Sequence, residues 1–363
     1  MERIHNFSAG PASIPIRVLE QINAELFDLS GTGMSILEIS HRSTVFDGVI
    51  EDAKANIRRL LNIPDQYHIL FLQGGASLQF SMIPINFLSQ SVDPAYYVVA
   101  GTWGKKAIEQ AIKEGDAKEL WNGSDQNFRR MPSLSELTLD SEACYVHITS
   151  NETIHGVQLH CNPNFDNVPL ICDMSSDFLS KPFPIDNYSL LYAGAQKNLG
   201  PAGLTIAIIR EEMLGQINSQ LHSMLDYRVY VEKQSLYNTP PVFPIYVTGL
   251  VTKWLIQEIG GLEKMAEYNE KKASILYNVI DESSGFYQGY AFQNSRSLMN
   301  VTWSILDKSL EQNFLQEAEE NGLYNLKGHR SIGGLRASLY NAVTLESVHV
   351  LEEFMRYFQS RWG

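Results

Sequence analysis

One lysine has the surroundings that covalent chemistry of an amine requires. Lys197 lies in the small-residue segment 192–203, between apolar runs at 190–192 and 204–209 that are typical of buried strands. A turn joining two buried strands is expected to lie near the core. Desolvation lowers the pKa of a lysine and makes its neutral amine available to condense with an aldehyde, as a Schiff-base lysine does. A purely structural turn lysine is the alternative that this segment leaves open.

A glycine turn follows the apolar run from His68 to Leu72. Its sequence, Gln73-Gly-Gly-Ala-Ser-Leu-Gln79, opens a predicted helix and includes Ala76 and Ser77. Free backbone amides at such a helix start can bind a phosphate, and a serine hydroxyl adds a donor. An ordinary strand-to-helix turn has the same composition, so both interpretations stay open here.

Three more apolar runs are followed by side chains with a chemical use, namely Trp103 after 96–100, Thr153 after 143–148 and Asp173 after 168–172. An indole can stack on a planar cofactor, and a carboxylate there can bind a protonated ring nitrogen. The alternatives are core packing for the tryptophan, a turn for the threonine and a helix cap for the aspartate. Packing alone does not readily explain why such side chains follow successive strands.

Paired basic residues form a second candidate site. They are His41-Arg42 near the amino end, and His329-Arg330 with Arg336 in the glycine-containing segment 327–338. Because the guanidinium group binds carboxylate and phosphate through two donors, this pattern favours an anion site. Solvated surface arginines are the alternative.

The elements that must position these residues form an α/β pattern. Between residues 66 and 210, short apolar runs alternate with helical or turn segments, which predicts a largely parallel sheet covered by helices. Ligands of such sheets bind at the carboxyl ends of the strands, which is where the candidate residues lie.

The last third of the chain predicts a smaller α+β unit. A helical stretch from Pro241 to Ile280 is interrupted by Gly260-Gly261, and strands at 297–306 and 331–340 flank a helix at 310–320. Thr344 is expected to cap a final amphipathic helix. We therefore expect an N-terminal segment at 1–15, a large domain at 16–260 and a small domain at 261–363.

Composition narrows the functional class. The chain has 363 residues, enough for about two domains, and its net charge of −13 disfavours a nucleic-acid partner. The first residues do not resemble a signal peptide and no apolar run approaches membrane-spanning length, so we expect a cytoplasmic protein without membrane contact. Cys144, Cys161 and Cys172 lack metal-ligand spacing and are expected to be core residues, and we predict no metal site.

Taken together, these motifs resemble the phosphoserine aminotransferase family, within the class V aminotransferases that use pyridoxal phosphate. The resemblance spans nearly the whole chain and rests on segments 6–11, 40–42, 73–77, 150–156, 193–198, 238–241, 328–330 and 333–338. The lysine segment and Gly328-His329-Arg330 are specific, whereas the glycine turn alone is not. The resemblance implies a fold type I homodimer with active sites at the subunit interface.

The resemblance also assigns roles to individual residues. It implies that Lys197 is the Schiff-base lysine, Asp173 the partner of the pyridine nitrogen, Trp103 the stacking ring and Thr153 the contact of the ring hydroxyl. The cofactor phosphate would be bound by Ala76, Ser77 and Gln196, and by Asn238 and Thr239 of the neighbouring subunit. Arg336 would bind the substrate α-carboxylate, and the distal anion would be bound by His41 and Arg42 with His329 and Arg330 of the partner chain.

The implied reaction transfers the amino group of L-glutamate to 3-phosphohydroxypyruvate, giving O-phospho-L-serine and 2-oxoglutarate in serine biosynthesis. It leaves open the 4-phosphohydroxy-L-threonine step of vitamin B6 synthesis. Some family members carry arginine where this chain has Ser77 and serine where it has Ala9, which leaves open how strongly the distal phosphate is bound. The alternatives are a serine-glyoxylate aminotransferase, a cysteine desulfurase, and a non-catalytic protein that binds the cofactor or an anion.

Overall fold

The computed structural model describes residues 3–139, 142–217 and 220–363. Its main sheet has seven strands in the order β2-β10-β9-β8-β5-β3-β4, and only β10 runs antiparallel to its neighbours. The strands are β2 Tyr67–Leu72, β3 Ala95–Val99, β4 Ala117–Asn122, β5 Tyr145–Thr149, β8 Leu170–Asp173, β9 Leu190–Gly194 and β10 Thr205–Arg210. Six of them confirm predicted apolar runs. Strand β4 was missed because it is a half-exposed edge strand without an apolar run.

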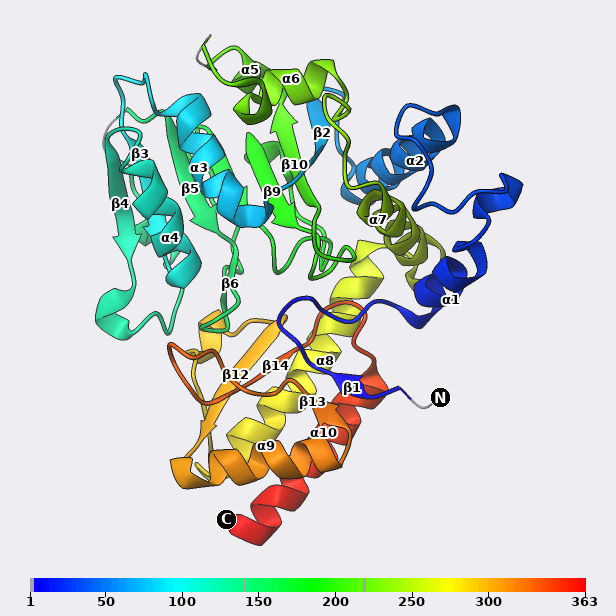
Figure 1. The fold of residues 1–363 in the computed structure, drawn as a ribbon. Helices are drawn as coiled ribbons and strands as arrows, with labels where there is room; N and C mark the ends of the chain where they lie inside the picture. Colours follow the sequence, from blue (N-terminus) through cyan, green and yellow to red (C-terminus); the bar gives the residue numbers. More distant parts are fainter. Residues whose placement is uncertain (1–2, 140–141, 218–219) are drawn as a thin grey trace.

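Helices cover both faces of this sheet (Figure 1). On one face α3 Gly75–Phe87 and α4 Thr102–Ala111 pack with Leu70 and Leu72 of β2. On the other face α2 Thr44–Leu61 and α7 Val242–Trp254 pack with Ile69 and Phe71. The remaining helices of this unit are α1 Ile16–Glu25, α5 Glu211–Leu214 and α6 Tyr227–Glu232. Alternate residues of one strand therefore face two separate cores, as expected for a sheet buried on both sides.

The smaller unit has its own antiparallel sheet, β11 Tyr287–Gly289, β12 Asn300–Ile305 and β14 Leu335–Ser338. It packs with α8 Leu262–Glu282, α9 Glu311–Glu320 and α10 Leu345–Trp362 around a core that contains Phe314. The Thr344 hydroxyl accepts a hydrogen bond from Ser347 N, which confirms the predicted cap. The predicted strand at 331–340 is too long, because residues 331–334 form a turn in which Gly333 and Gly334 have φ of +70° and +67°.

Two segments connect the units. Helix α8 begins in the core of the large unit with Leu262 and continues into the small core with Leu276. The amino-terminal strand β1 His5–Asn6 pairs with β13 Leu323–Tyr324 of the small unit. Helix α8 therefore packs in both cores, and β1 attaches the start of the 1–15 segment to the small unit. The boundary between residues 260 and 261 stays a prediction.

The strand register brings the carboxyl ends of four strands to one edge of the main sheet. Leu72 of β2 and Gly194 of β9 both pair with Thr205, while Asp173 of β8 pairs with Thr149 and Tyr192. Side chains that follow these strands must therefore gather at one edge of the sheet.

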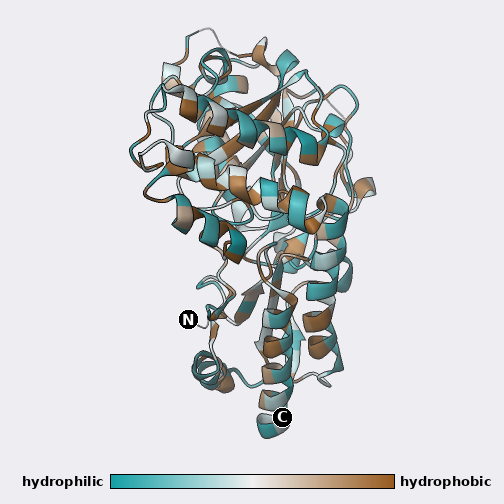
Figure 2. Ribbon diagram, turned by 90° about the vertical axis from the view of Figure 1, so that its right-hand side faces the viewer, coloured by the Kyte–Doolittle hydropathy of each residue, from teal (hydrophilic) through white to brown (hydrophobic). Residues whose placement is uncertain are grey.

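The helices carry mixed hydrophilic and hydrophobic residues (Figure 2). Within the described ranges, no helix has the length and apolar character needed to cross a membrane.

Candidate active site

Lys197 lies in the turn that follows β9, at the edge where the carboxyl ends gather. Its Nζ donates a 2.7 Å hydrogen bond to Thr153 Oγ1 and lies 5.9 Å from the centroid of the Trp103 ring. Burial lowers the pKa of Lys197 to about 8, although the nearby carboxylates Asp173 and Glu152 oppose the shift. The structure thus brings together a lysine, a hydroxyl and an aromatic ring, and it makes the amine easier to deprotonate than a surface lysine.

The turn is anchored through the neighbours of this lysine. Asn198 Nδ2 donates to Phe178 O at 2.9 Å, and Asn198 Oδ1 accepts from Asn341 N at 3.0 Å. The backbone oxygen of Gln196 accepts from Ala12 N at 2.9 Å. Because these bonds come from distant parts of the chain, the lysine backbone is fixed by tertiary contacts.

Asp173 is the last residue of β8 and is 3% exposed. Its Oδ1 accepts a 2.9 Å hydrogen bond from Ser175 N, and burial raises its pKa against the opposing effects of Ser175 and Lys197. Residues 174–180 form turns, so no helix begins there for Asp173 to cap. A buried carboxylate next to a lysine can bind and stabilise a protonated ring nitrogen.

Trp103 lies in the first turn of α4. Its Nε1 is buried without a hydrogen-bond partner among the described residues, and its ring is tilted against Phe80 at 6.5 Å between centroids. Both oxygens of Glu152 accept backbone hydrogen bonds from this turn, at 3.0 Å from Trp103 N and 2.8 Å from Gly104 N. The sequence analysis did not identify Glu152 as a site residue. The one signal that could have found it is that an acidic residue stands in an otherwise buried segment.

The glycine turn opens α3 as predicted. Gly74 and Gly75 have φ of +87° and +66°, and a Cβ on Gly74 would lie 2.6 Å from Leu78 Cβ, so the turn requires glycine. Ser77 is exposed and Ala76 half-buried. Asn238 Nδ2 donates to Gln73 Oε1 of the same chain at 3.1 Å, which places the segment before α7 beside this turn.

Arg336 extends from β14 of the small unit towards this group. Its guanidinium donates to Thr153 O at 3.2 Å, and burial lowers its pKa. No carboxylate in the described parts of the chain forms an ion pair with it. A half-buried cation next to Lys197 without a carboxylate partner is suited to an anionic ligand.

The two His-Arg pairs lie in different places. Burial and the charges of Arg336, Arg330 and Lys106 of the same protomer lower the pKa of His329. His41 and Arg42 precede α2, and within the described residues no side-chain hydrogen bond or ion pair joins them to the Lys197 group. The Nε2 atom of His41 is buried and has no hydrogen-bond partner in the part of the chain that the structure describes. The structure thus brings one of the two pairs to Arg336.

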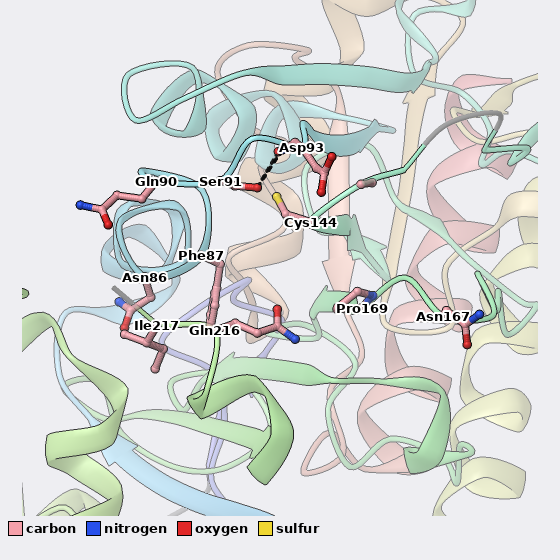
Figure 3. A pocket seen from close by; sticks show the side chains of 11 residues that line it. Asn86, Phe87, Gln90, Ser91, Asp93, Cys144, Asn167, Pro169, Gln216 and Ile217 are labelled. Atoms are coloured by element: carbon pink, nitrogen blue, oxygen red, sulfur yellow. Dashed lines mark hydrogen bonds between the residues drawn. The ribbon is translucent and has the colours of Figure 1, made fainter. Parts of the chain in front are cut away.

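A cavity of about 650 Å³ lies elsewhere (Figure 3). Its lining includes Asp93, Cys144 and Pro169, which precede β3, β5 and β8. It is therefore at the amino edge of the sheet, opposite the candidate site. Burial raises the pKa of the Cys144 thiol to about 11, so this cysteine is a poor nucleophile. All three cysteines are free, and the described residues contain no cluster of His, Cys, Asp and Glu that could hold a metal.

The chain is similar to known proteins along nearly its whole length. The aminotransferase class-V family model matches residues 4–351. Phosphoserine aminotransferases of Shouchella clausii and Geobacillus kaustophilus are each 49% identical, over 99% and 100% of this chain and 98% and 100% of their own.

Solved structures give the same result. The phosphoserine aminotransferase of Bacillus circulans subsp. alkalophilus superposes with a TM-score of 0.98 at 48% identity, over 100% of both chains. A phosphoserine aminotransferase of Trichomonas vaginalis with pyridoxal phosphate bound has a TM-score of 0.91 at 36% identity, over 98% of this chain and 100% of its own. With the site at the carboxyl edge of the sheet and similarity along its whole length, this chain belongs to the aminotransferase class-V family and, within it, to the phosphoserine aminotransferases.

Proposed function

We propose that this protein transfers the amino group of L-glutamate to 3-phosphohydroxypyruvate, giving O-phospho-L-serine and 2-oxoglutarate, with pyridoxal phosphate as its cofactor. The observation that carries the proposal is the full-length identity of about half to enzymes of that name. The half-buried Arg336, which forms no ion pair with a carboxylate of the described residues, supports it, because both substrates are anionic at each end. Synthesis of serine in the cytoplasm is part of the same proposal.

The residues of the site fit pyridoxal phosphate. Lys197 offers an amine of lowered pKa for the aldehyde, Asp173 a buried carboxylate for the ring nitrogen, and Trp103 a ring with an unpartnered indole nitrogen. We assign the phosphate to the glycine turn with Ala76 and Ser77, to Gln196, and to Asn238 and Thr239 of the neighbouring subunit. Thr153 is assigned to the ring hydroxyl. When bound, the cofactor supplies an electron sink for the bonds at the substrate α-carbon.

The protein's own residues supply binding and proton transfer. Arg336 binds the substrate α-carboxylate and orients the α-carbon towards Lys197. The Nζ atom of Lys197 would then take the proton from the substrate α-carbon and deliver it to the cofactor carbon that keeps the amino group, acting first as general base and then as general acid. A pKa of about 8 suits both steps near neutral pH. Asp173 would accept a hydrogen bond from the protonated ring nitrogen of the bound cofactor and keep that proton in place.

The distal anion is assigned to the two His-Arg pairs of a homodimer. Because the charge of Arg336 in the same chain lowers the pKa of His329, we assign His329 and Arg330 to their own active site. Within the described residues no side-chain hydrogen bond or ion pair joins His41 and Arg42 to that group, and we assign them to the partner's site. This arrangement reverses the one that the family resemblance implied, while keeping the shared site.

Mixing two inactive variants tests this arrangement. Arg42→Ala and Lys197→Ala subunits, unfolded together and refolded, should regain about a quarter of wild-type activity, since random pairing makes half the dimers mixed and each has one intact site. The steady-state rate of phosphoserine formation measures it. Each variant refolded alone is the control. No gain over refolded Arg42→Ala would show that Arg42 serves its own chain.

The function itself is tested by the absorbance of the bound cofactor. L-glutamate should convert the aldehyde form to the amine form, and 3-phosphohydroxypyruvate should restore the aldehyde form. Restoration by glyoxylate but not by the phosphorylated acid would contradict the substrate assignment, and no change with glutamate would indicate a non-catalytic cofactor-binding protein. A cysteine desulfurase is disfavoured because burial raises the pKa of Cys144, Cys161 and Cys172.

A further inference from the structure

A buried carboxylate lies beside the candidate site without a role in the reaction proposed above. Glu152 is the last residue of β6 Asn151–Glu152 and is 0% exposed. Its two oxygens accept hydrogen bonds from Trp103 N and Gly104 N, at 3.0 and 2.8 Å. These amides belong to the first turn of α4 and have no acceptor within the helix. The Glu152 side chain thus fixes the backbone segment that carries the Trp103 ring.

The chain around this carboxylate is shaped to admit it. A Cβ on Gly101 would lie 2.5 Å from Glu152 Cδ, and a Cβ on Gly104 would lie 2.9 Å from Val98 O. Gly101 has an extended φ of 176°, which any residue adopts, so glycine is needed there for close approach. The glycines on both sides of Trp103 therefore let the helix start approach β3 and Glu152.

The charges of the site also act on Glu152. Burial raises its pKa to about 7, the amides of Gly104 and Trp103 oppose that shift, Asp173 adds to it and Lys197 opposes it. Lys197 in turn lies 5.9 Å from the Trp103 ring centroid. The carboxylate is thus linked to the lysine through charge, and to the ring through the backbone of α4.

We infer that Glu152 is a positioning residue that fixes the first turn of α4 and thereby sets the Trp103 ring in place for the cofactor. The inference rests on the proposed function only in taking this ring to face pyridoxal phosphate. Glu152 acts through the helix backbone, and no contact with substrate is needed.

Cofactor binding by the full-length protein tests the inference. Pyridoxal phosphate is titrated into cofactor-free enzyme while tryptophan fluorescence is followed, and Trp103→Phe identifies the Trp103 contribution. Glu152→Gln should bind about tenfold more weakly and show altered Trp103 emission, because the amide nitrogen of glutamine cannot accept a hydrogen bond and one of the two α4 amides loses its acceptor. Glu109→Gln, which removes the same charge from an exposed position of α4, should bind as wild type.

Two further variants make the result decisive. Gly101→Ala displaces the Glu152 carboxylate by contact while leaving its charge, and should weaken binding similarly. The double variant Glu152→Gln/Trp103→Phe should bind no more weakly than Trp103→Phe, since the two residues act through one ring. Wild-type cofactor affinity in Glu152→Gln would overturn the inference. So would a double variant whose loss of binding free energy equals the sum of the two single losses. If Glu152→Gln does not fold, as judged by thermal unfolding, undiminished affinity in Gly101→Ala overturns it instead.

This experiment separates the inference from the proposed function. It needs the cofactor alone, so a wild-type protein that binds pyridoxal phosphate but does not exchange with glutamate would contradict the reaction and leave the role of Glu152 intact. Normal transamination by the wild-type protein, with unchanged cofactor affinity in the Glu152 and Gly101 variants, would support the reaction and contradict the role of Glu152.

Discussion

Replacing Lys197 with alanine is expected to lower turnover by more than about 10⁴-fold, because one amine is both the covalent anchor of the cofactor and the base for the α-proton. The steady-state rate of phosphoserine formation measures the loss. The absorbance of the lysine-bound cofactor should disappear with it. Since, within the described ranges, Lys197 Nζ forms its one hydrogen bond with Thr153 Oγ1, the fold should survive the change.

A matched control is Lys105→Ala, an exposed lysine of α4, which should keep wild-type rates. Borohydride reduction of the wild-type holoenzyme should attach the cofactor to the peptide that contains Lys197, as seen by mass spectrometry. Steady-state transamination by Lys197→Ala, or attachment at another lysine, would refute the assignment.

Replacing Asp173 with asparagine is expected to lower kcat by roughly 10²- to 10³-fold, the usual cost of removing one preorganised electrostatic contact from an active site. The side chain is 3% exposed, and its size and its hydrogen bond from Ser175 N are both preserved by asparagine. What is lost is the negative charge that keeps the ring nitrogen protonated. Single-turnover rates of the glutamate half-reaction measure the effect on chemistry directly.

The control for this variant is Asp186→Asn, which removes an exposed carboxylate from the connection between β8 and β9. It should leave kcat unchanged. If Asp173→Asn folded, bound the cofactor and kept a wild-type half-reaction rate, Asp173 would have no electronic role.

Much of the fold follows from local patterns in the chain. Buried strands must be apolar and short, so the runs that became β2, β3, β5, β8, β9 and β10 were visible as such. Parallel strands place their carboxyl ends on one edge, and Lys197, Asp173 and the glycine turn were found by looking just after each run. Capping by Thr344 and the helix interruption at Gly260-Gly261 were equally local, since both depend on adjacent backbone geometry.

Other features were decided only by tertiary packing. The antiparallel direction of β10, the pairing of β1 with β13, and the hydrogen bond of Arg336 to Thr153 O join residues far apart in sequence. No periodicity specifies such partners. Which segments pair depends on which surfaces remain exposed after the rest of the chain has packed.

Lys197 and Glu152 show this division between local sequence pattern and tertiary packing. The sequence alone determined that Lys197 follows a buried strand, because apolar runs and small-residue turns are local properties. Only the tertiary structure placed Thr153 and Trp103 around its amine and brought Glu152 to the backbone of α4. A buried carboxylate has to find amide donors, and here these donors lie on a helix about fifty residues earlier in the chain.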